Sequence, residues 1–474
     1  MSQPNILFIL IDDLGWRDLS VYGSPFYETP HIDRLAAEGV RFTDAYAACP
    51  VCSPTRASIL TGKYPATVGI TDWIDWSGNV HPARGRVIDV PYLKHLPTSE
   101  YSLARALAAA GYATWHVGKW HLGGEGHLPQ DHGFEVNIGG CHWGSPGRGG
   151  YFSPWAIPTL QDADVPDGTY LTDYLTDRAI DLIRNSGSRP FFLNLWYYSV
   201  HIPIEAKPDK IAKYEAKARR LGLDKVKAFE EGDYFPCEHK RHLRIVRRLV
   251  QSDAVYAAMI ESLDENIGRL LHTLEAVGKA ENTIVIFTSD NGGLATAEGS
   301  PTCNAPLSEG KGWMYEGGTR EPLLIKWPGV TTPGAVIDVP VTSPDFYPTL
   351  LEMAGLPLIS EQHTDGISLA PLLRGAHRLD REAIFWHYPH YGNQGGTPGA
   401  SVRLGDYKLI TFYEDDHAEL YNLREDIAEE RDLAAEEPRR VAEMRQLLEE
   451  WRARVGALMP QPNPDYCPPK GCSA

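Results

Sequence analysis

Three short apolar runs, separated by helical patterns, constrain the fold of this 474-residue chain more than any other feature. The runs cover residues 5–11, 189–199 and 283–288, and each is followed by polar or charged residues. Runs this short and this apolar are typical of strands buried on both faces of a parallel sheet. Helical patterns lie between them, over residues 31–38, 102–110, 171–184 and 253–277. This alternation predicts an α/β fold with a large, mostly parallel sheet sandwiched by helices.

The pattern changes near residue 382. Short strand-like pieces separated by turn residues follow, over residues 383–387, 400–403, 407–413 and 419–422. Residues 438–455 then have the pattern of an amphipathic helix. We therefore predict an α/β domain over residues 1–381, in which residues 334–381 form a link. A smaller antiparallel-sheet plus helix subdomain is predicted over residues 382–474, with a Pro-rich tail extended on its surface after Leu458.

The chain is acidic, with a formal net charge of -17. Nucleic-acid surfaces and anionic membranes require clustered Lys and Arg, so neither is an expected partner. The start of the sequence has no basic region and no small-residue cleavage site, and we expect no signal peptide in it and no membrane span. The expected location is cytoplasmic, or periplasmic or secreted if a signal has been removed. The sequence leaves the oligomeric state open.

Seven cysteines make an odd number, so they cannot all pair with one another. Cys467 and Cys472 could close a small disulfide loop in the tail. A chain without an export signal more often keeps its thiols reduced, so both states remain open.

Residues 207–248 are rich in Lys and Arg within this acidic chain. Such runs are usually a solvated helical face, and that is the interpretation we favour. The alternative is a basic flap over an acidic polysaccharide.

Polar residues follow the apolar runs at the places where a sheet of this kind binds ligands. Asp12 and Asp13 follow the first run, His201 the second, and Asp290 and Asn291 the third. The carboxyl ends of parallel strands meet in one crevice. Oxygen ligands of this type suit Ca²⁺ or Mg²⁺, and carboxylates gathered in one cleft repel unless a cation compensates them. We therefore predict a divalent-metal site, with helix caps or turns as the alternative.

Cys52 is followed by Pro54, Arg56 and an apolar stretch, which indicates a nucleophile at the start of a helix. Proline suits the first helical turn, where a missing N–H costs nothing. The free N–H groups and the macrodipole would favour an anion beside Cys52, and Arg56 could contact an oxyanion such as sulfate or phosphate. The alternative is a half-buried structural Cys beside a surface Arg.

Two further elements carry charged or titratable side chains. If residues 118–123 are extended, Lys119 and His121 face the same side. Lys311 stands between glycines that permit close approach of the backbone to a ligand. Taken singly, a structural histidine and a glycine-rich surface loop explain these elements equally well.

Taken together and in this order, these elements resemble the type I sulfatases of the alkaline phosphatase-like superfamily, and the run from Cys52 to Gly62 is the most specific part of the match. The resemblance implies that a maturation enzyme oxidises Cys52 to formylglycine. It implies a divalent metal, usually calcium with magnesium as the alternative. The implied metal ligands are Asp12, Asp13, Asp290, Asn291 and the modified Cys52.

The resemblance also implies roles for the remaining residues. Arg56 would steady the formylglycine, with His121 as a hydrogen-bonding partner, while Lys119, His201 and Lys311 would grip the sulfate and its leaving oxygen. One hydroxyl of the hydrated aldehyde would attack sulfur, and His201 or Lys311 would protonate the departing alcohol. His121 would deprotonate the second hydroxyl, so that sulfate is expelled as the aldehyde forms again.

Specificity is expected from loops over residues 72–76, 141–143 and 387–403, where aromatic, acidic and basic residues could bind a sugar. Core packing is the alternative role for these aromatics. The expected substrate is a sulfated saccharide of the galactose type, or an aryl sulfate. The rival functions are a phosphomonoester, phosphodiester or phosphonate hydrolase, and a non-catalytic glycan-binding protein. The candidate specificity residues are Trp73, Trp76, His142, His387, His390 and Arg403.

Overall fold

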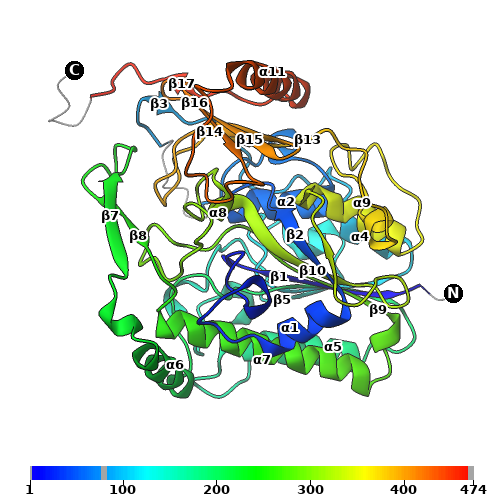
Figure 1. Ribbon diagram of the computed structural model, residues 1–474. Coiled ribbons are helices and arrows are strands. Elements are labelled where there is room, and N and C mark those ends of the chain that lie inside the picture. Colours follow the sequence, from blue (N-terminus) through cyan, green and yellow to red (C-terminus); the bar gives the residue numbers. More distant parts are fainter. Residues whose placement is uncertain (1–2, 76–82, 468–474) are drawn as a thin grey trace.

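The computed structural model of the protein describes residues 3–75 and 83–467 (Figure 1). Trp76 and Cys472 lie outside these residues, and so does the proposed Cys467–Cys472 disulfide. Among the residues described, every helix is too short or too polar to cross a lipid bilayer.

The main sheet has the strand order β11-β2-β10-β9-β1-β6-β4-β5, with β12 also paired to β2. Five adjacent strands, from β9 to β5, run parallel, while β10 is antiparallel to both of its neighbours. The mostly parallel sheet predicted from the sequence is thus confirmed, and its three apolar runs form β1, β6 and β9. The strands are β1 Asn5–Ile11, β2 Val40–Tyr46, β4 Ala113–Gly118, β5 Val136–Ile138, β6 Phe191–Trp196, β9 Thr283–Ser289, β10 Arg320–Lys326, β11 Ala335–Ile337 and β12 Val341–Thr342.

Helices cover both faces of this sheet (Figure 1). α1 (Pro30–Glu38), α5 (Leu171–Arg184) and α7 (Ala254–Ala276) bury their apolar stripes on one face. α2 (Cys52–Thr61), α4 (Leu103–Ala109) and α9 (Phe346–Met353) form a core with the other face. Two of these starts are specified locally, because the side chains of Ser102 and Asp253 accept hydrogen bonds from backbone N–H groups in the first turns of α4 and α7. The shorter or peripheral helices are α3 Pro65–Val68, α6 Pro208–Arg220, α8 Glu316–Thr319 and α10 Ala370–Leu373.

A second, antiparallel sheet has the order β13-β14-β15-β16. Its side chains alternate: Phe385, Val402 and Leu409 face a core with the long C-terminal helix, whereas Trp386 and Ile410 face the main body. This architecture agrees with the predicted antiparallel-sheet and helix unit. The face of the sheet toward the main body packs against Cys49 and Val51, which precede α2 in the chain. The elements are β13 Ala383–Tyr388, β14 Gly399–Leu404, β15 Tyr407–Phe412, β16 Ala418–Asn422 and α11 Pro438–Val455.

Two short pairings complete the described structure. β17 (Gln461–Pro462) pairs with β3 (Val87–Ile88), so the tail crosses back onto the main body as an exposed extended segment. β7 (Phe229–Tyr234) and β8 (Arg244–Arg248) form a hairpin that projects from the body beside α6 (Figure 1).

The basic segment is largely paired with acids of its own chain. Lys210 and Lys213 on α6 lie 3.1 and 2.8 Å from carboxylate oxygens of Glu261 on α7, and Arg247 lies 2.6 Å from Glu309. These pairs favour a solvated surface over the basic flap. The predicted helical face is confirmed only for residues 208–220, because residues 229–234 and 244–248 form the strands of the hairpin.

Candidate active site

The topology brings the predicted site residues to one edge of the main sheet. β4, β6, β1 and β9 are parallel neighbours, so the residues after their carboxyl ends share that edge. β2 runs parallel to β9 because β10, between them, is antiparallel to both, and the chain after β2 leads to Cys52. The segment with Lys311 precedes β10, whose amino end lies at the same edge.

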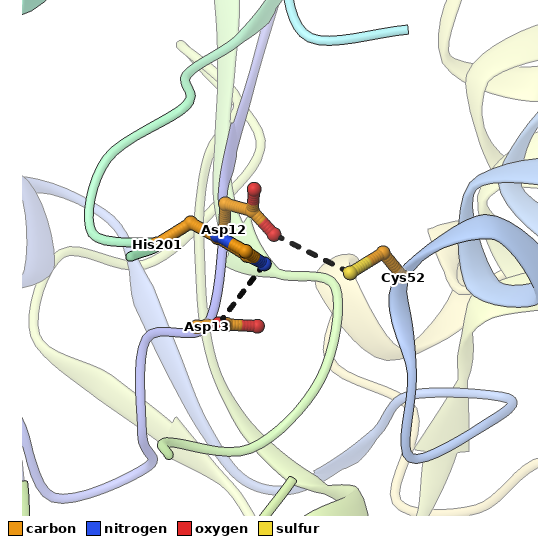
Figure 2. Close-up of side chains that lie close together, drawn as sticks. All are labelled: Asp12, Asp13, Cys52 and His201. Carbon is orange, nitrogen blue, oxygen red and sulfur yellow. Dashed lines mark hydrogen bonds and ion pairs between the residues drawn. The ribbon is translucent and has the colours of Figure 1, made fainter. Parts of the chain in front are cut away.

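Cys52 is the first residue of α2 and is almost fully buried, as is Arg56 one turn later. Its Sγ lies 3.6 Å from Oδ1 of Asp12 (Figure 2). The alternative of a half-buried Cys beside a surface Arg is therefore wrong. Burial raises the pKa of the Cys52 thiol to about 12, although Lys119 and Lys311 oppose this. An unmodified Cys52 would carry almost no thiolate at neutral pH and would be a poor nucleophile.

Asp12, Asp13, Cys52 and His201 converge so closely that one ligand atom from each lies within 4.8 Å of the others (Figure 2). Asn291 donates a hydrogen bond from Nδ2 to Asp13 Oδ1 at 2.8 Å. Its own Oδ1 is buried and has no hydrogen-bond partner. Because a buried carbonyl oxygen is costly to leave unpaired, this atom beside two carboxylates fits a hard cation.

Arg56 forms a salt bridge with Asp290 and does not line the pocket. Its Nε and Nη2 lie 2.8 and 2.7 Å from Asp290 Oδ2, and its Nη1 donates to the Lys119 carbonyl at 3.0 Å. Asp290 Oδ1 accepts from the Asp13 N–H at 3.2 Å. The Arg56 guanidinium is wholly buried, orients Asp290 and does not line the pocket, so this structure places it away from the position of a substrate oxyanion.

Lys119 and Lys311 bring positive charge to the acids. Lys119 Nζ lies 2.6 Å from Asp12 Oδ2, and Lys311 Nζ lies 2.8 Å from Asp13 Oδ2. Burial raises the pKa of Asp12 to about 8 despite Lys119. Burial also disfavours ionisation of Asp13, but Lys311 and His201 outweigh it and lower the pKa of Asp13 below its usual range. The acidic chain thus concentrates cations where an anionic substrate would bind.

Lys119 and His121 reach the site through a turn, which corrects the expected extended segment. Gly118 has φ +104°, and a Cβ there would lie 1.9 Å from the Trp196 carbonyl oxygen, so the chain can turn here only with glycine. His121 also has a positive φ, of 58°.

The His121 ring has one committed nitrogen and one without a partner. Its Nε2 lies 2.8 Å from the Ile74 carbonyl, which can only accept, so Nε2 carries the proton. Nδ1 is buried and has no hydrogen-bond partner. Burial, and then Lys119, hold the pKa of His121 well below its usual value. The ring is therefore neutral and offers Nδ1 as a proton acceptor.

His201 is held in a similar way. Its Nδ1 donates to the Ile202 carbonyl at 2.8 Å, which directs Nε2 toward Asp13 Oδ2, 3.7 Å away. Burial and the neighbouring Lys311 lower the pKa of His201 to about 3. In this arrangement Lys311, not His201, carries a proton at neutral pH.

A pocket of about 140 Å³ opens beside Cys52. Trp73, predicted to bind substrate, lines this pocket. The loop of His142 also reaches the pocket, but it does so through Gly144 and Ser145. The lining residues are Val51, Cys52, Trp73, His121, Gly144, Ser145, His201, Ile202, Glu298, Lys311, Asn393 and Gln394.

Three predicted specificity residues have other roles in the structure. His387 lies between the Tyr413 hydroxyl and the Leu458 carbonyl, at 2.7 and 2.9 Å. His390 is buried between Thr71 and Asp89. Arg403 lies 2.7 Å from Asp44. Their side chains are used within the protein and do not line the pocket.

Among the lining residues that the sequence did not single out are Glu298, Asn393 and Gln394. Asn393 and Gln394 fall within the predicted loop, but in a glycine-rich turn without a recognisable motif. Glu298 follows the Asp290 element with no signal that separates it from an ordinary surface carboxylate.

Comparison with known proteins decides the family. A family model described as Sulfatase matches residues 4–356, and the model of the N-sulphoglucosamine sulphohydrolase C-terminal region matches residues 309–454. The chain belongs to the sulfatase family. It is thus a sulfuric ester hydrolase, as the resemblance implied.

Relatives of this sulfatase cover most of its length. A protein named Sulfatase from Formosa agariphila is 36% identical, over 92% of this chain and 85% of its own. The human N-acetylgalactosamine-6-sulfatase is 34% identical, over 81% and 68%. Among solved structures, Ps i-CgsB in complex with k-i-k-neocarrahexaose has a TM-score of 0.73 and 27% identity, over 95% and 92%. BT4656 in complex with D-glucosamine-2-N,6-O-disulfate has a TM-score of 0.72 and 25% identity, over 96% and 98%.

Proposed function

We propose that this sulfatase removes sulfate from a sulfated saccharide and that residue 52 supplies the nucleophile, after a maturation enzyme has converted Cys52 to formylglycine. The observation that carries the proposal is the convergence of Cys52 with two carboxylates, two lysines and two neutral histidines beside one pocket. The raised pKa of the unmodified Cys52 thiol supports the modification, because a buried thiol that keeps its proton is a weak nucleophile.

We further propose that Asp12, Asp13, Asp290 and Asn291, with the modified Cys52, hold calcium, with magnesium as the alternative. The unpaired Asn291 Oδ1 and the neighbouring acids support a hard cation. When bound, the cation would stabilise negative charge on the sulfate ester and favour ionisation of the nucleophile. Arg56 would keep Asp290 in position from the side away from the pocket.

The chain's own residues would handle the substrate and its protons. Lys311 lines the pocket and carries a proton, so it would pair with the sulfate and give its proton to the departing alcohol oxygen. His201 is neutral and its Nδ1 donates to the Ile202 carbonyl, so its Nε2 has no proton to give, and this favours Lys311 over His201 as the donor. Lys119 would add positive charge from behind Asp12. His121 would accept a proton at Nδ1 when sulfate is expelled. Such preorganised charge is usually the largest contribution to catalysis.

The organic part of the substrate is proposed to be a hexose of the galactose type. Trp73 at the pocket wall can stack on a sugar ring. Relatives that are named as N-acetylgalactosamine-6-sulfatases, and a similar structure that binds a sulfated glucosamine, also support a hexose sulfate.

The experiment has two readings on protein produced with and without a formylglycine-generating enzyme. Peptide mass spectrometry should show a loss of about 18 Da at Cys52 only with that enzyme. The modified protein should hydrolyse 4-nitrophenyl sulfate faster than 4-nitrophenyl phosphate, and Cys52→Ala should hydrolyse neither. Faster phosphate turnover would instead establish the phosphohydrolase alternative. Modified protein that binds sulfated saccharides without turnover would establish the non-catalytic one.

A further inference from the structure

The pocket carries charges of both signs. Lys311, His121 and His201 lie beside Cys52, where the sulfate would bind. Among the described residues that line the pocket, Glu298 is the one carboxylate, and it is exposed to solvent. Polar uncharged groups of Asn393, Gln394 and Ser145 also line the pocket. The part of a substrate beyond its sulfate therefore meets one negative charge and several neutral polar groups.

Gln394 holds the Glu298 carboxylate in place. Its Nε2 donates to Glu298 Oε2 at 3.1 Å, and its side chain is buried, so the amide is a fixed donor. The Gln394 backbone carbonyl accepts from Trp313 Nε1 at 3.1 Å and from the Thr296 hydroxyl at 2.9 Å, which fixes the backbone that carries this amide. Because one oxygen of Glu298 is committed to this amide, the other is available to a ligand at a defined position.

The backbone around Glu298 is also fixed. Glu298 has φ 53°, a left-handed conformation that few non-glycine residues adopt. The Ser300 N–H closes the turn onto the Ala297 carbonyl at 2.8 Å, and the Ser300 hydroxyl donates to the Val246 carbonyl of β8 at 2.7 Å. An exposed carboxylate on a turn held at both sides is preorganised for recognition and is unlike a freely moving surface glutamate.

A fixed carboxylate distinguishes between sugars by charge. It accepts hydrogen bonds from ring hydroxyls or from an amide N–H, and such bonds to a charged acceptor are strong. A second sulfate or a carboxylate on the sugar ring would face a like charge with no described cation other than Lys311 beside it in the lining. Like-charge contacts are a common way in which sites reject the wrong partner.

We propose that Glu298, positioned by Gln394, selects a neutral sugar ring bearing a single sulfate and rejects rings with a second anionic group. This inference rests on the proposed sulfatase reaction at position 52. It assigns Glu298 as a specificity residue that binds the hydroxyls of the ring, and Gln394 as a positioning residue that acts through it.

The test compares Glu298→Gln with the wild type, both with Cys52 modified, on three substrates. N-acetylgalactosamine 6-sulfate is the neutral monosulfate, N-acetylgalactosamine 4,6-disulfate carries the second anion, and 4-nitrophenyl sulfate has no sugar. The matched control is Glu281→Gln, an exposed glutamate before β9, at the opposite edge of the sheet.

We expect Glu298→Gln to lower kcat/KM for the monosulfate about tenfold, mainly through KM, as the loss of hydrogen bonds to a charged group would. The ratio of disulfate to monosulfate turnover should rise at least tenfold, and 4-nitrophenyl sulfate turnover should stay within about twofold. In the Glu298→Gln background, Gln394→Leu should cost little more, because its effect passes through Glu298.

An unchanged substrate ratio in Glu298→Gln, or a change shared by Glu281→Gln, would overturn the inference. So would an equal loss on all three substrates, which would indicate a general role in catalysis or folding. These outcomes differ from failure of the proposed function, in which modified wild-type protein would not hydrolyse 4-nitrophenyl sulfate at all.

Discussion

Two buried charge clusters in this sulfatase have the same formal composition and different surroundings. The site cluster joins Asp12, Asp13 and Asp290 to Arg56, Lys119 and Lys311. The intersheet cluster joins the main sheet to the antiparallel sheet through three acids and three bases. Its members are Asp44, Glu316, Glu429, Arg320, Arg403 and Lys408.

In both clusters every carboxylate has a nearby cation. The intersheet contacts run from 2.6 Å for Arg320 with Glu316, through 2.8 Å for Lys408 with Glu316, to 3.3 Å for Lys408 with Glu429. They differ in whether buried atoms without a hydrogen-bond partner lie beside a pocket. The site cluster borders a pocket, and such atoms lie beside it, among them Oδ1 of Asn291 and Nδ1 of His121. In the intersheet cluster, Oε1 of Glu429 also lacks a hydrogen bond, but it faces Lys408 at 3.3 Å and not a pocket.

The intersheet cluster is turned inward, between β2 and β10 on one side and β14 and β15 on the other, and none of its members lines the pocket. The comparison teaches that buried ion pairs alone do not mark a functional site. Coordinating capacity left unpaired beside a pocket does. Changes in the site cluster should therefore affect turnover and cation binding, and changes in the intersheet cluster should affect stability.

The largest expected effect is on turnover. Asp13→Asn removes a proposed cation ligand and the partner of Lys311. We expect 4-nitrophenyl sulfate hydrolysis by the modified protein to fall more than about 100-fold. Loss of a residue that only hydrogen-bonds to a metal ligand can already lower activity by up to about 100-fold, and Asp13 is proposed as a ligand itself. Thermal unfolding with and without Ca²⁺ should show a calcium-dependent stabilisation in the wild type and none in the variant.

The control for this prediction is Asp44→Asn in the intersheet cluster, which should keep most of the turnover and all of the calcium response. Equal loss of turnover in the two variants would remove the functional distinction between the clusters.

The next effect is on stability. Lys408→Met removes the buried cation that Glu316 and Glu429 share, and Arg320 remains beside Glu316. Loss of one partner from a buried pair typically lowers the free energy of unfolding by about 3–5 kcal/mol. Chemical denaturation should detect this, while kcat of the folded, modified variant should change little. The control is Lys213→Met, whose side chain is 45% exposed and whose pairs with Glu28 and Glu261 should contribute about 1 kcal/mol or less. Matching losses for the two variants would contradict the prediction.

Residues of the site cluster could be predicted from the sequence where they end an apolar run or stand in a recognisable motif. Asp12 and Asp290 end apolar runs, and parallel strands bring their carboxyl ends together, so their convergence could be predicted. The short glycine-rich elements around Lys119 and Lys311 were located by their motifs. The turn at Gly118 that delivers Lys119 and His121 was not, because it depends on the close approach of the Trp196 carbonyl.

The intersheet cluster gave no comparable signal. Arg403 is a basic residue near aromatic residues, as substrate-binding residues often are. Only its register on β14 places it against Asp44 of the other sheet. His387 and His390 pair within the protein and do not line the pocket, which periodicity could not predict, because it does not say which loop covers a strand face. Glu298 and Gln394 were missed because their roles depend on one hydrogen bond between residues 96 positions apart.

The smallest expected effect is a pH dependence confined to the intersheet cluster. Burial raises the pKa of Glu429 to about 8, although Lys408 opposes it, whereas Lys408 and Arg320 lower the pKa of Glu316. The folded protein thus holds a proton on Glu429 that the unfolded chain releases near pH 4.5. Because the unfolded state then binds fewer protons, this group makes stability fall as pH rises from about 4.5 to about 8.

Glu429→Gln should remove this dependence, because the amide is neutral at every pH and keeps an oxygen for the Glu316 N–H, now 2.7 Å from Glu429 Oε2. The free energy of unfolding of the variant relative to the wild type should rise between pH 5 and pH 8 by at least about 1.4 kcal/mol, the equivalent of one pKa unit. The exposed neighbour supplies the control, Glu430→Gln, which should follow the wild type. A constant difference across this range would mean that Glu429 is ionised throughout. The intersheet cluster would then be a fully charged network, and its chemical difference from the site cluster would lie in the pocket alone.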